Sequence, residues 1–172
     1  MTETGAVTLP NMKLLIVDDA PSNVALLEEL LAESGYTRIR SLTDARELTE
    51  TCKTFAPDLV LLDLAMPHVD GFAVLESLRG RALDAHVPVI VLTADVSEQT
   101  KRRALAAGAT DFLHKPFDHV EVLLRINNLL ELRRLQQQLQ NQRAACEDAV
   151  RARSTEVRDG RAQLAHGLPT LV

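Results

Sequence analysis

The sequence has 172 residues, of which 46% are hydrophobic and 25% are charged, values typical of a globular protein with one sizeable core. The net charge is -5, and the chain contains four Phe, one Tyr and no Trp. Nucleic-acid binding usually needs a basic surface, often with aromatic side chains on which bases stack. We therefore expect no direct contact with nucleic acid, and a single domain with an appendage.

The N-terminal residues 1–12 are expected to form a tail. They begin MTETGAVTLPN, without the basic start and apolar core of a secretory signal. No apolar run in the chain approaches the roughly 20 residues that span a bilayer. Cys52 and Cys146 are isolated and lack metal-ligand spacing, which is typical of structural thiols in a reducing compartment. These observations predict a cytoplasmic protein that makes no membrane contact.

Short apolar runs alternate with amphipathic segments from residue 13 to residue 115. The strand candidates are KLLIV (13–17), TRIRS (37–41), DLVLLD (58–63), VPVIVLTA (87–94) and DFLHK (111–115). The helix candidates are PSNVALLEELLAESG (21–35), TDARELTETCKTF (43–55), GFAVLESLRG (71–80) and SEQTKRRALAAG (97–108). The more polar run 37–41 suits a sheet edge. Such alternation predicts an α/β fold, a doubly wound, five-stranded parallel sheet with helices on both faces.

The C-terminal part of the chain is rich in good helix formers. Four apolar residues of its first turns are expected to pack on the sheet: Val120, Leu123, Leu124 and Ile126. A coiled-coil seam then follows at spacings of three and four, weakening after Cys146: Leu132, Leu135, Leu139, Gln142, Cys146, Val150, Arg153 and Val157. We therefore predict a domain at 13–130, a coiled-coil extension at 131–165 and a tail at 166–172. A helix from residue 119 onward would extend roughly 70 Å, and we expect it to mediate a homodimer.

Acidic residues end two of the predicted strands. Asp18 and Asp19 follow the strand at 13–17, and Asp63 ends the run LVLLD at 59–63. In the flavodoxin-like strand order 2-1-3-4-5, the first and third strands are neighbours at the switch point, where open α/β sheets bind ligands. Three carboxylates in one crevice repel one another, and a hard divalent cation with oxygen ligands relieves that repulsion. The sequence therefore predicts a site for Mg²⁺ (or Mn²⁺).

Two further groups lie at the same predicted edge of the sheet. Thr93 follows the fourth apolar run and Lys115 follows the fifth. A carboxylate, a hydroxyl, a cation and a metal ion are the groups that phosphoryl transfer requires, because the protein's task there is positioning and charge neutralisation. These strand-end residues together predict a phosphoryl-transfer site.

The set of strand-end residues resembles that of the receiver domain of two-component response regulators, over about residues 13–130. The matching positions are Asp18, Asp19, Asp63, Thr93 and Lys115. The resemblance implies that Asp63 accepts a phosphoryl group from a phosphohistidine of a sensor histidine kinase. It also implies a signalling domain and not an enzyme, with self-phosphorylation and autodephosphorylation as its chemistry at most.

The resemblance also assigns roles around the acceptor. The metal ligands would be Asp18, Asp19, Asp63 and the main-chain carbonyl of Ala65. Lys115 would pair with Asp63 and later with the phosphoryl oxygens, and the peptide bond before Pro116 would be cis. Thr93 would hydrogen-bond the phosphoryl group, and Phe112 would turn inward into the space that Thr93 leaves.

Each of these residues also has a purely structural interpretation. Asp18 could be an exposed N-cap of the following helix, and Thr93 could satisfy a backbone group at a strand end. Lys115 could be a surface cation, and Phe112 a core side chain. Taken as a set, they favour the phosphoacceptor site.

The extension at 131–165 is similar to linkers that join receivers to cyclic-di-GMP phosphodiesterase, diguanylate cyclase or phosphatase output domains. The main prediction is a receiver that signals through a conformational change and coiled-coil dimerisation. One alternative is the N-terminal regulatory part of a larger output protein. The others are a phosphorylation-independent dimeric scaffold and a metal-dependent phosphohydrolase that uses the same carboxylates.

Overall fold

The structure is a computed structural model that describes residues 9–67, 69–82, 84, 86–95 and 97–166. For residues 81, 82, 156 and 158–166 it describes the backbone alone. The outer parts of the two predicted tails, residues 1–8 and 167–172, lie outside the described residues. The chain divides into two compact units, residues 1–134 and residues 135–172.

The first unit is built on a sheet of five parallel strands. The strands are β1 (Lys13–Val17), β2 (Arg38–Leu42), β3 (Leu59–Asp63), β4 (Val89–Thr93) and β5 (Asp111–His114). Their order is β2-β1-β3-β4-β5, and every neighbouring pair is parallel, which confirms the predicted fold. All five residues of β3 and of β4 are buried, whereas the edge strand β2 is largely open to solvent, as its polar sequence predicts.

Helices follow the strands as the sequence predicts. They are α1 (Pro21–Glu33), α2 (Leu48–Phe55), α3 (Gly71–Ser77), α4 (Glu98–Ala106) and α5 (His119–His166). Short helical turns accompany them: η1 (Leu9–Asn11), η2 (Ala45–Glu47) and the π-helical η3 (Leu78–Ala82). Asp70 and Ser97 cap α3 and α4 by accepting backbone N–H bonds from Phe72 and Thr100, because the first N–H groups of a helix lack partners within it.

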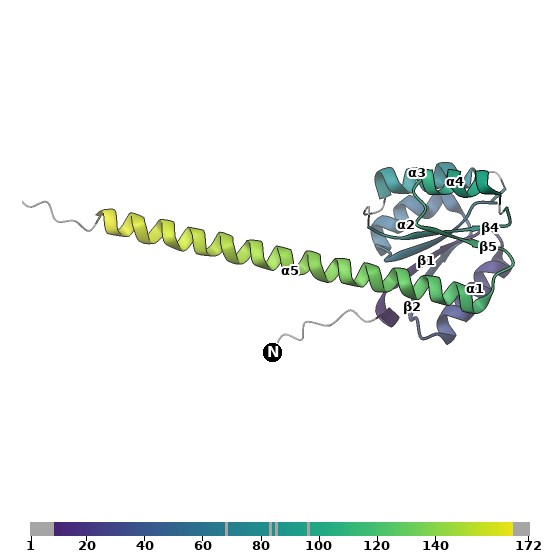
Figure 1. Cartoon of the computed structure of the whole chain (residues 1–172), viewed down its shortest axis with the longest axis horizontal. Helices are drawn as coiled ribbons and strands as arrows, with labels where there is room; N and C mark the ends of the chain where they lie inside the picture. Colours follow the sequence, from purple (N-terminus) through teal and green to yellow (C-terminus); the bar gives the residue numbers. More distant parts are fainter. Residues whose placement is uncertain (1–8, 68, 83, 85, 96, 167–172) are drawn as a thin grey trace, which may run out of the picture. The chain divides into compact units, whose positions relative to one another are not determined.

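Helices cover both faces of the sheet (Figure 1), and the sheet separates two apolar cores. One core joins β-strand residues to α1 and to the first turns of α5, through Leu27, Leu31, Val122 and Ile126. The other lies on the opposite face, with the residues of α2, α3 and α4, where Leu75 is fully buried. Both faces of the sheet are therefore covered, and functional side chains are confined to the strand ends.

The face by which α5 packs on the sheet differs in part from the prediction. Ile126 is fully buried and Leu123 partly buried, but Val120 is 64% and Leu124 57% exposed, so the prediction for these two is wrong. The buried residues Val122, Ile126 and Leu130 recur every four positions. Residues 120 and 124 stand two positions away from that row, about 200° around a helix with 3.6 residues per turn.

Beyond the first unit, α5 continues as a helix to His166. Every side chain described from Gln138 to Val157 is exposed. The seam residues Leu132, Leu135 and Leu139 are 53%, 44% and 55% exposed, so within this single chain the seam is uncovered. None of the helices in the described part of the chain has the length and apolar character to cross a membrane.

Candidate functional site

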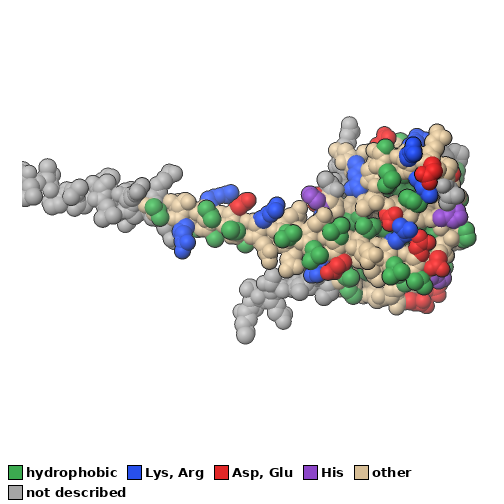
Figure 2. All heavy atoms as spheres, viewed as in Figure 1, with side chains coloured by type: hydrophobic (Ala, Val, Ile, Leu, Met, Phe, Trp, Pro, Cys, Tyr) green, Lys and Arg blue, Asp and Glu red, His purple; other side chains and the backbone are tan. Residues whose placement is uncertain are grey.

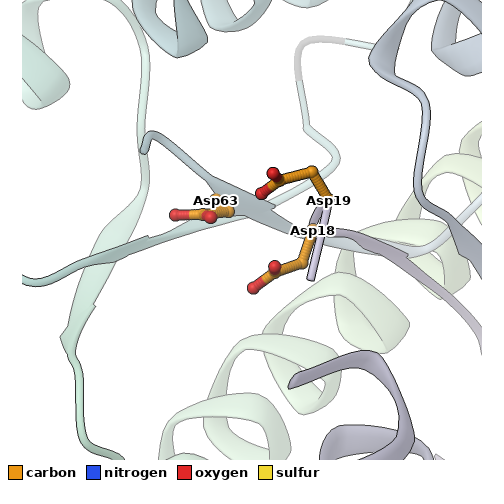
Figure 3. Close-up of side chains that lie close together, drawn as sticks. All are labelled: Asp18, Asp19 and Asp63. Carbon is orange, nitrogen blue, oxygen red and sulfur yellow. The ribbon is translucent and has the colours of Figure 1, made fainter. Parts of the chain in front are cut away.

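Three carboxylates meet at the ends of β1 and β3. Asp18 and Asp19 directly follow β1, and Asp63 is the last residue of β3. These two strands are hydrogen-bonded neighbours, with Val17 opposite Leu62. One carboxylate oxygen from each of the three residues lies within 4.8 Å of the others, and Figure 3 shows all three side chains pointing to the same side of the strand ends. The topology thus brings together the three acids that the sequence singles out.

Asp18 is fixed from several directions. It is fully buried, and its carboxylate accepts hydrogen bonds from Ala20 N at 2.9 Å and from Asn23 Nδ2 at 3.0 and 3.2 Å. The N-cap residue of α1 is Ala20, so the interpretation of Asp18 as an exposed N-cap is wrong. Buried carboxylates need such donors because water is not available to solvate their charge.

Lys115 joins the carboxylates across the site. Its Nζ lies 2.8 Å from Asp18 Oδ2 and 3.1 Å from Asp63 Oδ2, and its side chain is only 19% exposed, so it is not a surface cation. Burial by itself lowers the pKa of Lys115, but hydrogen bonds to Asp18 and Asp63 and the charges of both outweigh it. The net effect raises the pKa above its ordinary value, and the ammonium stays charged. The peptide bond to Pro116 is cis.

The loop after β3 holds the acceptor candidate in place. The backbone N–H of Ala65 donates to Asp63 Oδ1 at 3.0 Å, and Ala65 itself is exposed. A Cβ atom at Gly71 would lie 2.6 Å from the Cα of Leu64. Glycine is therefore required where α3 begins, because no side chain fits against the backbone just after Asp63.

Thr93 ends β4, next to the strand that carries Asp63. It is 5% exposed. Its Oγ1 accepts a hydrogen bond from Asp95 N at 3.0 Å and donates one to Asp95 O at 3.3 Å. In this arrangement Thr93 satisfies backbone groups of the β4–α4 loop, which is the structural interpretation of this residue.

Phe112 lies on β5 opposite Val91 of β4. Its ring is partly buried against the core on the α3 and α4 face, so it is not an ordinary core residue. Lys101 of α4 places its Nζ 5.0 Å from the ring centroid, a cation–π distance, and lies 3.5 Å from Glu98 Oε1. The ring is thus covered by a charged side chain on one side and packs against the apolar core on the other.

Asn23 is the site residue that sequence reasoning missed. It lies in the first turn of α1 and donates to both oxygens of Asp18. An uncharged amide in a predicted helix has no distinguishing pattern, and only its position five residues after Asp18 could have suggested the contact.

The site carries excess negative charge. It contains the buried carboxylates of Asp18 and Asp63, the half-buried carboxylate of Asp19 and a single ammonium, that of Lys115. Oxygen ligands in close proximity suit a hard divalent cation such as Mg²⁺. A cation together with Lys115 provides two positive centres beside the Asp63 carboxylate, an arrangement that can stabilise a phosphoryl group in transfer.

The sequence is similar to a known family and to several curated proteins. The family model for the response regulator receiver domain matches residues 14–127. The response regulator PleD of Caulobacter vibrioides is 32% identical over 133 residues, 77% of this chain and 29% of PleD. The regulatory protein PhoP of Bacillus subtilis is 39% identical over 120 residues, 70% of this chain and 49% of PhoP. A probable cyclic di-GMP phosphodiesterase of Vibrio cholerae is 32% identical over 149 residues, 87% of this chain and 33% of that protein.

Solved structures lead to the same family. A response regulator of Chloroflexus aurantiacus has a TM-score of 0.65 at 31% identity and covers 70% of this chain and 98% of its own. The receiver domain of a sensor histidine kinase from Pseudomonas aeruginosa, which has a magnesium ion coordinated in its active site cleft, has a TM-score of 0.64 at 27% identity, with the same coverage. The chain spans less than half the length of the three curated relatives named above. On its sequence match and its fold, the chain belongs to the family of response regulator receiver domains.

Proposed function

We propose that this chain is a phosphorylation switch in which Asp63 accepts a phosphoryl group from the phosphohistidine of a sensor histidine kinase. The observation that carries the proposal is the position of Lys115 Nζ, within 3.1 Å of Asp63 Oδ2 and 2.8 Å of Asp18 Oδ2. An ammonium at that point neutralises charge on the acceptor and then on the oxygens transferred to it. The family membership supports the same assignment.

The chemistry of the donor set fits Mg²⁺, with Mn²⁺ as a possible substitute. Asp18, Asp19 and Asp63 supply oxygens within 4.8 Å of one another, and the main-chain carbonyl of Ala65 would complete the protein ligands. When bound, the ion neutralises phosphoryl oxygens during transfer. The half-buried position of Asp19 leaves water access to the site, as Mg²⁺ usually keeps several water ligands.

In the transfer step, an Asp63 carboxylate oxygen forms a bond to phosphorus while the bond from phosphorus to the histidine nitrogen breaks. The electron pair of that bond leaves with the imidazole of the kinase. Ala65 N–H and Lys115 hold the two oxygens of Asp63 in orientation, because each is bonded to a different one. The site residues only position groups and neutralise charge. The domain therefore acts as a signalling domain that turns over no substrate, and its only further reaction is loss of its own phosphoryl group to water.

After transfer, we propose that the hydroxyl of Thr93 leaves the backbone of Asp95 and donates to a phosphoryl oxygen. Phe112 then turns into the space that Thr93 vacates. The phosphoryl group adds negative charge to an already acidic site, and this charge drives the change because it needs new hydrogen-bond donors.

The output is proposed to pass through α5. The uncovered seam residues of this helix favour a homodimer. Signalling through such a dimer requires contact with neither a membrane nor nucleic acid, and we place it in the cytoplasm. Because the curated relatives are longer, the chain could equally serve as the regulatory part of a larger protein, such as one with a cyclic di-GMP phosphodiesterase domain. In both cases the receiver performs the same chemistry.

The experiment that tests the proposal is an intact-mass measurement after incubation with acetyl phosphate. With Mg²⁺ present, the wild-type chain should gain the mass of one phosphoryl group, and EDTA should prevent the gain. Asp63→Asn should gain nothing, whereas the matched control Asp44→Asn, at an exposed carboxylate, should be modified like wild type. Equal modification of Asp63→Asn and wild type would refute the proposal.

A dimeric scaffold that ignores phosphorylation is the second candidate, favoured by the uncovered seam of α5. Light scattering of the Mg²⁺-loaded chain with and without beryllofluoride separates the two. A change in mass or hydrodynamic size that Asp63→Asn abolishes supports the switch. A dimer of constant size in every condition supports the scaffold.

A further inference from the structure

The unit formed by residues 135–172 presents a narrow apolar stripe. Leu135, Leu139, Val150 and Val157 are 44%, 55%, 61% and 58% exposed, and Cys146 is exposed as well. Figure 2 shows hydrophobic side chains at intervals along this part of α5. Helices in proteins owe most of their stability to packing of an apolar face, so this stripe requires a partner surface.

The stripe repeats every eleven residues. The series are Leu135, Cys146 and Val157; Leu139 and Val150; and Gln142 and Arg153. A strict heptad would continue from Cys146 to the small residue Ala149, but the large apolar residue is its neighbour Val150. Eleven residues over three turns is about 3.67 per turn, which gives a straight to slightly right-handed pairing and not the left-handed heptad supercoil.

Resting on the homodimer proposed above, we infer that a second copy of this chain covers the stripe, parallel and in register. A stripe of one or two residues per turn is the width that a two-helix seam buries. In a two-fold dimer the same patch serves both subunits, so each seam residue then faces its own counterpart.

The polar seam positions favour the parallel orientation. In parallel register, Gln142 faces Gln142 of the second copy, and the two amides can hydrogen-bond. In an antiparallel pair centred on Cys146, Gln142 would face Val150, which would leave its amide buried against an apolar side chain. The parallel pair places Arg153 beside its counterpart, but a side chain of that length carries its charge out to water.

The residues that flank the stripe favour a protein partner over a lipid surface. On a helix with 100° per residue, Ala145 and Ala149 lie on one side of the stripe, and Arg143 and Glu147 lie on the other. Around Cys146, a parallel pair therefore sets the charged side of one copy against the small, neutral side of the other, which avoids repulsion there. Residues 136–142 carry no charge, unlike the Lys- and Arg-rich polar face of a membrane-surface helix.

Disulfide cross-linking of the full chain tests the orientation. In a Cys146→Ala background, cysteines are placed one at a time at Leu139, Val150 and Ala144, and the wild-type chain reports on Cys146 itself. Each protein is oxidised with diamide and resolved on a non-reducing gel. The Ala144→Cys variant is the matched control, because residue 144 lies on the opposite side of the helix from the stripe. The Cys146→Ala chain controls for Cys52, which is buried.

Parallel, in-register pairing predicts rapid covalent dimers for cysteine at 139, 146 and 150, and more than tenfold slower ones at 144. An antiparallel pair centred on Cys146 would cross-link at 146 alone, because residue 139 and its counterpart would be roughly 21 Å apart at 1.5 Å per residue. That result, or equal rates at all four positions, would overturn the inference.

The same proteins are phosphorylated with acetyl phosphate and Mg²⁺ and weighed, which separates the two proposals. A chain that is phosphorylated but fails to cross-link at 139 and 150 refutes only the pairing. A chain that cross-links at these positions but gains no phosphoryl group refutes only the phosphoacceptor.

Discussion

Lys115 has two carboxylate partners in the structure. The sequence predicts its contact with Asp63, but the shorter contact is to Asp18, at 2.8 Å against 3.1 Å. Both partners are buried and the ammonium is largely so. We therefore expect its removal to destabilise the unphosphorylated domain as well as to impair the proposed transfer.

Lys115→Met should reveal this structural role. Without Mg²⁺, the substitution leaves buried carboxylates without their cation, and we expect it to lower the free energy of unfolding by up to about 3 kcal/mol, less if a carboxyl group takes up a proton instead. Mg²⁺ should then raise the Tm of this variant more than that of wild type. Lys53→Met, at an exposed position on α2, is the control. An equal rise in Tm on addition of Mg²⁺ in all three proteins would show that Lys115 and the ion do not neutralise the same carboxylates.

Lys101 should resist movement of Phe112. Its ammonium lies over the ring in the arrangement in which Thr93 is bonded to Asp95, so turning the ring away would lose this contact. Lys101→Met should therefore tighten beryllofluoride binding in the presence of Mg²⁺ about two- to fivefold. This factor corresponds to the free energy of a cation–π contact at a partly exposed site. Lys101→Arg should behave like wild type. Weaker binding by the Met variant would mean that the contact stabilises the phosphorylated form.

The two cysteines should differ in reactivity. Burial raises the pKa of the Cys52 thiol to about 11, whereas Cys146 is exposed. Titration of the native chain with a thiol reagent at mildly alkaline pH should therefore modify Cys146 quickly and Cys52 only on unfolding.

The same shift of Cys52 has a consequence for stability. Because the folded thiol holds its proton to a higher pH than the unfolded one, the free energy of unfolding should fall as pH rises from the ordinary thiol pKa toward about 11. Cys52→Ala should make that decline shallower, as measured by denaturant unfolding at several pH values. A decline of the same steepness in both proteins would contradict the assignment.

At the scale of elements, the sequence predicts the strands and helices, because buried parallel strands read as unbroken apolar runs. The sheet order comes from the doubly wound fold that their alternation favours. The faces of α5 were harder to assign. Val120, Val122, Leu124 and Ile126 are all apolar and alternate along the chain, so periodicity alone does not show which row faces the sheet. The acid cluster followed from strand order, since strand ends at the switch point must meet. The hydrogen bonds of Thr93 depend on the conformation of the β4–α4 loop, and the contact of Asn23 with Asp18 depends on where α1 begins. No sequence pattern encodes either.

Alanine substitutions on α5 should separate its two faces. Ile126 is fully buried and Leu124 is 57% exposed. Ile126→Ala should lower the free energy of unfolding by about 3 kcal/mol, because it leaves a cavity in the core. Leu124→Ala should change it by less than about 0.5 kcal/mol. Denaturant unfolding measures both, and similar losses would mean that Leu124 is covered in solution.

At the scale of the whole molecule, the receiver and the seam of α5 are linked by one continuous helix. Phosphorylation can shift the equilibrium between two arrangements of the proposed dimer only by the free energy with which the phosphoryl group stabilises one over the other. For that purpose the site supplies a largely buried ammonium, a threonine hydroxyl and three carboxylates that would hold a cation. The proposed switch therefore depends first on which carboxylate carries the phosphoryl group.

That residue can be identified by borohydride trapping. The chain is phosphorylated with acetyl phosphate and Mg²⁺, then treated with borohydride, which reduces an aspartyl phosphate to homoserine, and the peptides are sequenced by tandem mass spectrometry. We predict homoserine at position 63, and none when Mg²⁺ is removed. Homoserine at position 18 or 19, or its absence from a chain that has gained a phosphoryl group, would contradict the assignment of Asp63 as the acceptor.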